Sequence, residues 1–179
     1  MNRKILLCCA VAAWALTIVI ICWLQDAGAE GGMVSRVKDG DTLAVRIVGG
    51  EETAVRLYGI DAPEKRQPFG PEAGDYLVSL ASGKAVVLDR VSTDRYGRLV
   101  AMVEVGGERL QSAMVAAGYA WVYRPYCRDG PYCRELTRLE GEARAAGRGL
   151  WAQPEPTPPW EYRKLSKEAK ASQHKEESR

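Results

Sequence analysis

Five charged residues beside turn-forming sequences could do chemistry: the acids Asp41, Asp61 and Glu64, and the arginines Arg56 and Arg98. Carboxylate oxygens are the ligands that Ca²⁺ and Mg²⁺ prefer in proteins. Guanidinium groups match phosphate oxygens through paired hydrogen bonds. Together these groups could hold a hard cation against a phosphodiester.

Each of these groups, taken alone, also has a structural explanation. Asp-Gly-Asp is a common turn, Asp-Ala-Pro-Glu could cap a loop, and the hairpin before Arg98 could expose its arginine to solvent. Arg56 is harder to explain in this way. A strand arginine between Val55 and Leu57 points to the opposite face and needs a partner there. The joint presence of the acids and the arginine pair favours a functional site.

Composition limits the possible classes of protein. The 179 residues suit one domain with appendages, and a hydrophobic fraction of 46% is enough for a core. The net charge of +2 is not that of a general nucleic-acid coat protein, so any polyanion must bind a local basic patch. The single histidine, His174, lies in a charged C-terminal segment, which argues against nucleases that use a histidine of the folded domain.

The N-terminus carries a targeting signal. Two basic residues precede the apolar run Ile5–Leu24, and small residues follow it up to Ala29. This pattern fits a secretory signal cleaved after Ala29. The run is also long enough to span a bilayer as an uncleaved anchor, with its positive end inside. Both alternatives place the chain from Glu30 onward outside the cytoplasm, periplasmic, secreted or tethered to the membrane.

Two cysteines remain in the part of the chain after this segment. Cys127 and Cys133 flank an Asp-Gly-Pro turn that could bring them together. An oxidising compartment would let a disulfide persist, and the short loop would stabilise the fold by roughly 2 kcal/mol. A zinc site is the poorer alternative, because no histidine is near and no second cysteine pair completes it. The sequence therefore predicts a disulfide.

The pattern of apolar residues predicts strands and helices in an α+β fold. Strands are expected over 43–47, 55–58, 84–91 and 99–105, and helices over 71–83, 110–118 and 133–147. We expect a five-stranded closed barrel of the OB type with about three packed helices. This domain spans 30–152. A proline-rich linker and a charged tail follow over 153–179, and the tail is expected to be solvated, disordered or a frayed helix.

These motifs resemble the staphylococcal nuclease-like, or thermonuclease, family. The segments that carry the resemblance are Asp39–Thr42, Arg56–Glu64, Phe69–Ala73, Asp94–Arg98 and Gly149–Trp151. The resemblance implies a Ca²⁺-dependent endonuclease that hydrolyses DNA and RNA in single-stranded or locally open form and leaves 3′-phosphate ends. It also implies a monomer.

The resemblance assigns roles position by position. Asp41 and Asp61 match carboxylate ligands of Ca²⁺, and the backbone carbonyl of Ala62 matches a third ligand. Glu64 matches the residue that orients or deprotonates the attacking water. The pair that grips the phosphate corresponds to Arg56 and Arg98.

Three further positions match contacts with the nucleotide phosphate and base in this family. These are Arg95, Trp121 and Tyr123, and Trp121 stands where a tyrosine is usual. The loop between Glu64 and Pro71 is shorter than in the archetype, so substrate preference could differ. Two alternatives to an enzyme stay open: a non-catalytic binding module of the same fold, and an envelope protein that docks partners. The retained acids and arginines argue against the first.

Overall fold

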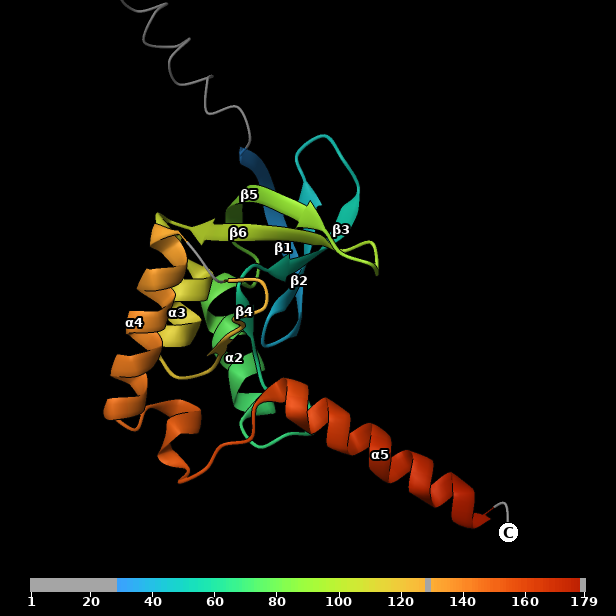
Figure 1. Ribbon diagram of the computed structural model, residues 1–179. Coiled ribbons are helices and arrows are strands. Elements are labelled where there is room, and N and C mark those ends of the chain that lie inside the picture. Colours follow the sequence, from blue (N-terminus) through green and yellow to red (C-terminus); the bar gives the residue numbers. More distant parts are fainter. Residues whose placement is uncertain (1–28, 128–129, 178–179) are drawn as a thin grey trace, which may run out of the picture.

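A closed five-stranded barrel forms the centre of the protein, as the sequence predicted (Figure 1). The computed structural model describes residues 29–127 and 130–177, so the predicted signal or anchor over 1–28 lies outside the described residues. The ring is closed by parallel pairing of its two end strands, residues 52–57 and 99–105. The other neighbouring strands in the ring pair antiparallel. In ring order the strands are β3 (Glu52–Leu57), β2 (Thr42–Ile47), β1 (Ala29–Asp39), β5 (Ala85–Thr93) and β6 (Leu99–Val105).

The strands follow the alternation of apolar residues. In β6 the buried side chains are Leu99, Ala101 and Val103, two positions apart, which turns one face of the strand to the core. A hairpin joins β2 to β3, and Gly49 in its turn has a φ of 73°, which glycine adopts without strain. The sequence did not predict β1. This strand shifts register twice against β2, and such irregularities bend a strand around a barrel.

Three helices cover one side of the barrel (Figure 1). They are α2 (Gly70–Ala81), α3 (Leu110–Ala116) and α4 (Pro131–Ala145), close to the predicted ranges. α2 has Pro71 in its first turn, where a missing N–H does no harm, and it buries Ala73 and Leu77. α3 contacts both α2 and α4. A short strand, β7 (Glu108–Arg109), extends the sheet beyond β6.

The C-terminal segment forms a helix, which was one of the alternatives that the sequence left open for this charged tail. After the 3₁₀ turn η1 (Gly149–Ala152), a helix, α5 (Pro159–Glu177), runs away from the domain (Figure 1). Its composition is mostly charged and small, so packing within the helix does little to stabilise it. Contacts of its first turns with the domain supply the stabilisation. No described helix is long and apolar enough to cross a membrane.

A disulfide joins Cys127 to Cys133, as the spacing predicted, with Cα atoms 5.4 Å apart. It ties the start of α4 to the preceding loop. Gly59 lies against it, because a Cβ on Gly59 would stand 2.8 Å from the sulfur of Cys127. The N–H of Tyr123 donates to the carbonyl of Gly59 over 2.8 Å. The disulfide therefore supports the turn that leads from β3 into the next strand.

Two glycines bring the end of α3 against η1. The φ of Gly118 is 77°, and a Cβ there would lie 2.1 Å from the carbonyl oxygen of Arg148. The N–H of Leu150 donates to the carbonyl of Gly118 over 2.9 Å. Leu150 is buried. This contact fixes the last turn of the domain. It also requires glycine at position 149, because a Cβ there would lie 2.3 Å from the carbonyl oxygen of Gly118.

We predict that Gly118→Ala lowers the free energy of unfolding by about 2 kcal/mol or more, because it adds a backbone collision to a strained φ. Gly83→Ala is the matched control. Gly83 also has a positive φ of 68°, but nothing lies within 4 Å of its Cβ position. Gly83→Ala should lower the free energy of unfolding by only about 1 kcal/mol. Urea unfolding measures both, and equal losses would contradict the role given to the close approach.

Candidate active site

The turn between β1 and β2 positions Asp41. The N–H of Asp41 donates to the side chain of Asp39 over 3.2 Å, and the N–H of Leu57 donates to the carbonyl of Asp41 over 2.9 Å. Gly40 presses against Ala62, because a Cβ at Gly40 would lie 2.7 Å from the Cβ of Ala62. Asp41 is only 5% exposed. The surrounding backbone therefore fixes the position of the Asp41 carboxylate.

A second, two-stranded sheet positions Asp61. β4 (Ile60–Asp61) pairs antiparallel with β8 (Trp121–Val122), and this register places Asp61 opposite Trp121. Asp61 is 1% exposed. The N–H of the next residue, Ala62, donates to Oδ2 of Asp41 over 2.8 Å. The two acids are therefore joined through the backbone of Ala62.

Arg56 lies between the two buried acids. It stands opposite Thr42 in the β2–β3 pairing. One of its terminal nitrogens forms an ion pair with Asp41, and the other donates to Oδ1 of Asp61 over 2.8 Å. Burial lowers the pKa of Arg56, and the nearby charge of Asp61 opposes that shift. Both carboxylates thus converge on a single guanidinium, which offsets the cost of burying two negative charges.

Arg98 lies in the turn between β5 and β6 and is linked to Asp41 through Thr42. Its Nε donates to Asp94 over 2.7 Å, and its NH1 lies 3.5 Å from the hydroxyl of Thr42. That hydroxyl donates to Oδ1 of Asp41 over 3.0 Å. Burial raises the pKa of Asp94, but hydrogen bonds from Arg98 outweigh it and lower the pKa overall. The ion pair that orients Arg98 therefore lasts above the lowered pKa and is lost only as pH falls through it.

Glu64 lies on the short loop between β4 and α2. Its N–H donates to the side chain of Gln67 over 3.1 Å, and the N–H of Gln67 donates back to the carbonyl of Glu64 over 2.8 Å. Gly70 touches this loop, since a Cβ there would lie 1.9 Å from the oxygen of Glu64. The side chain of Glu64 is 40% exposed. It can therefore meet water, unlike the two buried aspartates.

The three expected nucleotide contacts lie in different surroundings. Trp121 is buried and packs against Trp151, with ring centroids 4.2 Å apart. Tyr123 is half-buried on the segment after β8. Arg95 is exposed in the β5–β6 turn and donates to the hydroxyl of its neighbour Tyr96 over 2.8 Å. The structure thus pairs Trp121 with Asp61 across the small sheet, while the described contacts of Arg95 stay within its own turn.

Sequence reasoning missed one residue that contacts the acids, Arg163 on α5. Its terminal nitrogens donate to both oxygens of Asp61, over 3.2 Å and 2.7 Å. One of them also donates to Glu64 over 2.7 Å. Partial burial lowers the pKa of Arg163, but these hydrogen bonds raise it more, so the net shift is upward. The only signal in the sequence was an aromatic pair near Arg163 in an otherwise charged and small segment.

The donor atoms suit a hard cation. Asp41 and Asp61 offer carboxylate oxygens on either side of one cationic group, and Ala62 offers a backbone carbonyl. Oxygen donors of this kind are what Ca²⁺ takes. Within the described ranges, no group of three or more His, Cys, Asp or Glu side chains could hold a metal ion.

Comparison with known proteins identifies the family of the chain. The family model described as staphylococcal nuclease homologue matches residues 54–153, which is more than half of the chain. The chain belongs to the staphylococcal nuclease family. The matched segment of this family member includes Arg56, Asp61, Glu64 and Arg98, while α5 lies beyond it.

Relatives that match most of this nuclease-family chain include named nucleases. An uncharacterized endonuclease of Escherichia coli O157:H7 is 40% identical over 149 residues, covering 83% of this chain and 94% of the relative. A protein named micrococcal nuclease from Shigella flexneri is 36% identical over 169 residues, covering 89% and 95%. Protein ParB of Escherichia coli is 40% identical over 165 residues, covering 87% and 90%. The two relatives named as nucleases, with the family match, support nuclease function for this member of the family.

We predict that Asp94→Asn lowers nuclease kcat/KM about tenfold, because Arg98 loses its charged partner while the amide oxygen still accepts the two backbone N–H bonds of the turn. Asp75→Asn, at an exposed position of α2, is the matched control. In an Arg98→Ala background, Asp94→Asn should add little further loss. An additive loss in the double variant would show that Asp94 acts other than through Arg98.

Proposed function

We propose that the protein is a Ca²⁺-dependent endonuclease that hydrolyses the phosphodiester bonds of DNA and RNA outside the cytoplasm. The observation that carries the proposal is the convergence of Asp41 and Asp61 on Arg56. The geometry adds Arg98 next to Thr42 and an accessible carboxylate, Glu64, on the adjoining loop. Membership of the nuclease family supports the same reaction class.

Two arginines would stabilise the transition state. Hydrolysis gathers negative charge on the oxygens of a five-coordinate phosphorus, and preorganised donors that meet this charge lower the barrier. Arg56 lies on β3, and Arg98 lies in the turn before β6, where Asp94 orients it. When bound to Asp41, Asp61 and the carbonyl of Ala62, Ca²⁺ would supply further positive charge to a phosphate oxygen.

Glu64 would act on the attacking water. A carboxylate in reach of water can orient it or accept its proton as the P–O bond forms. The bond from phosphorus to the 5′-oxygen then breaks, the departing oxygen takes up a proton, and a 3′-phosphate remains. The loop that carries Glu64 is held by its reciprocal hydrogen bonds with Gln67. This fixed backbone would place the carboxylate on one side of the phosphate.

An extracytoplasmic location is part of the proposal. The basic start and apolar run of the N-terminal segment are typical of a signal or an anchor. The disulfide between Cys127 and Cys133 supports the same conclusion, because disulfides persist in oxidising compartments. Both features would place the nuclease domain in the periplasm or outside the cell.

The decisive experiment uses the full-length chain in mild detergent with denatured DNA or RNA, in Ca²⁺ or in chelator. We expect degradation with Ca²⁺ only. Glu64→Gln and Arg98→Ala should each reduce the rate by about a hundredfold or more. Glu51→Gln, an exposed glutamate in the β2–β3 hairpin, is the control for loss of one acidic charge and should keep the wild-type rate.

Two outcomes would contradict this function. No turnover under any metal by a folded protein that still binds single-stranded DNA would favour a non-catalytic binding module. Turnover that is the same in chelator as in Ca²⁺, and is lost in Glu64→Gln, would keep the nuclease and remove the calcium dependence.

A further inference from the structure

The C-terminal helix α5 places two different side chains on two different parts of the candidate site. Arg163 binds the acids Asp61 and Glu64. Trp160, three residues earlier, packs against Trp121 and Tyr123, with ring centroids 5.8 Å and 5.5 Å apart. Residues three apart lie on the same face of a helix. One face of α5 therefore covers both the acids and the aromatic residues.

The contacts of Arg163 use atoms that a metal would need. Both carboxylate oxygens of Asp61 accept its hydrogen bonds, and Glu64 accepts a third. Asp61 is also paired with Arg56, so two guanidiniums already balance its charge. A divalent cation bound to these Asp61 oxygens would lie next to the guanidinium of Arg163, and like charges that close repel each other. Binding of either one therefore weakens binding of the other.

Trp160 occupies the aromatic side of the site in a similar way. Its ring lies beside the rings of Trp121 and Tyr123, at distances typical of aromatic contacts. Exposed aromatic rings are the surfaces on which unpaired bases stack. A base that stacks on Tyr123 would have to take the place of Trp160. α5 thus competes with both a cation and a base.

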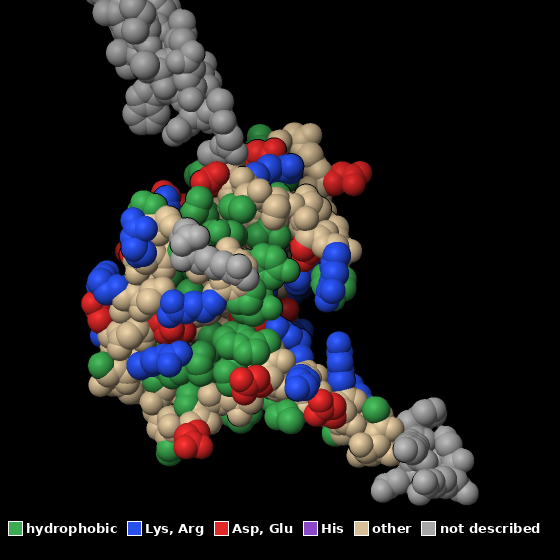
Figure 2. All heavy atoms as spheres, viewed as in Figure 1, with side chains coloured by type: hydrophobic (Ala, Val, Ile, Leu, Met, Phe, Trp, Pro, Cys, Tyr) green, Lys and Arg blue, Asp and Glu red, His purple; other side chains and the backbone are tan. Residues whose placement is uncertain are grey.

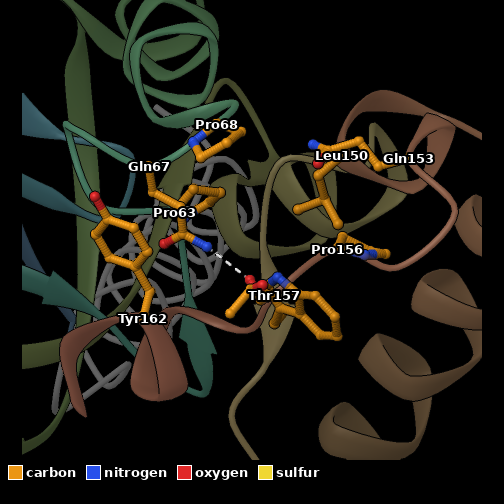
Figure 3. Close-up of a pocket in the computed structure, with 9 residues that line it drawn as sticks. Pro63, Gln67, Pro68, Leu150, Gln153, Pro156, Thr157 and Tyr162 are labelled. Carbon is orange, nitrogen blue, oxygen red and sulfur yellow. Dashed lines mark hydrogen bonds between the residues drawn. The ribbon is translucent and has the colours of Figure 1, made fainter. Parts of the chain in front are cut away.

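The segment before α5 holds it to the loop that carries Glu64. The side-chain amide of Gln67 donates to the carbonyl of Thr157 over 2.6 Å, and the hydroxyl of Tyr162 donates to the carbonyl of Arg66 over 3.0 Å. Figure 3 shows residues of the linker and of this loop lining one pocket. The linker is rich in proline, so less chain entropy is lost when it docks.

The docked segment remains able to leave. The side chain of Arg163 is 41% exposed, and beyond its first turns α5 runs away from the domain (Figure 1). Figure 2 shows a hollow between the barrel and α5, with Lys and Arg side chains on both sides. Because the guanidinium of Arg163 is partly solvated, it can return to water when a cation takes its place at Asp61.

We propose that residues 153–163 form an autoinhibitory strap, in which Arg163 takes the place of the metal and Trp160 the place of a base until cation and substrate displace them together. This inference rests on the proposed function, because it assigns the covered atoms to metal and substrate. It predicts that the unliganded protein is held closed. A polynucleotide and a divalent cation would each bind more tightly once the strap is released.

The first test measures Ca²⁺ affinity by titration calorimetry on the full-length chain in mild detergent. Arg163→Ala should bind Ca²⁺ at least about fivefold more tightly than wild type. Trp160→Ala should also bind it more tightly, although it changes no charge. Lys167→Ala, which removes a positive charge from an exposed position one turn further along α5, should bind within about twofold of wild type. If only Arg163→Ala bound Ca²⁺ more tightly, the effect would be explained by local electrostatics. That result would contradict the proposed strap.

The second test needs no metal. A lysine-specific endoproteinase cleaves after Lys164 and the lysines beyond it but not after Arg163, and docking of the first turns of α5 should slow this cleavage in chelator. We expect Arg163→Ala and Trp160→Ala to be cut several-fold faster than wild type, and Glu168→Gln, at an exposed position of α5, to be cut at the wild-type rate. Equal rates in all proteins would overturn the strap. Faster cutting without Ca²⁺ binding by any variant would leave a docked strap and refute the proposed metal site and the competition for it.

Discussion

The ion pairs of Arg56 with Asp41 and Asp61 are the constraint on which the rest of the site depends. Two carboxylates that are almost fully buried repel each other, and burial of each one is unfavourable without a partner. One guanidinium between them satisfies both. Three separate strand pairings must therefore agree in register. β2 with β3 places Arg56, the β1–β2 turn places Asp41, and β4 with β8 places Asp61.

Closure of the barrel extends this arrangement to the second arginine. β3 pairs with β6 so that Arg56 stands opposite Val100, two residues from Arg98. The turn before β6 holds Asp94, which binds the side chain of Arg98 and two N–H groups of the same turn. One carboxylate thus fixes both the turn and the arginine. The charged groups of the site form a connected chain from Asp94 through Arg98 and Thr42 to Asp41.

Much of this could be predicted from the sequence because the signals are local. Alternating apolar residues indicated β6, glycine and proline marked the helix ends, and Arg56 in an apolar strand demanded a charged partner. β1 escaped prediction because its two register shifts break the alternation that marks a strand. The role of α5 could not be predicted for a different reason. A charged helix gains its stability from contacts with residues about a hundred positions away, and no local pattern reports them.

The parallel pairing of β3 with β6 has a consequence for the order in which this protein acquires its charge network. Residues 55–57 pair with residues 99–101, so a whole helix and strand must be in place before the ring can close. Pairing between distant segments is slow compared with hairpin formation. The guanidinium of Arg56 therefore meets Asp41 early, across a hairpin, while Arg98 joins only at closure. An unfolded chain would therefore carry only part of this charge network until the barrel closes.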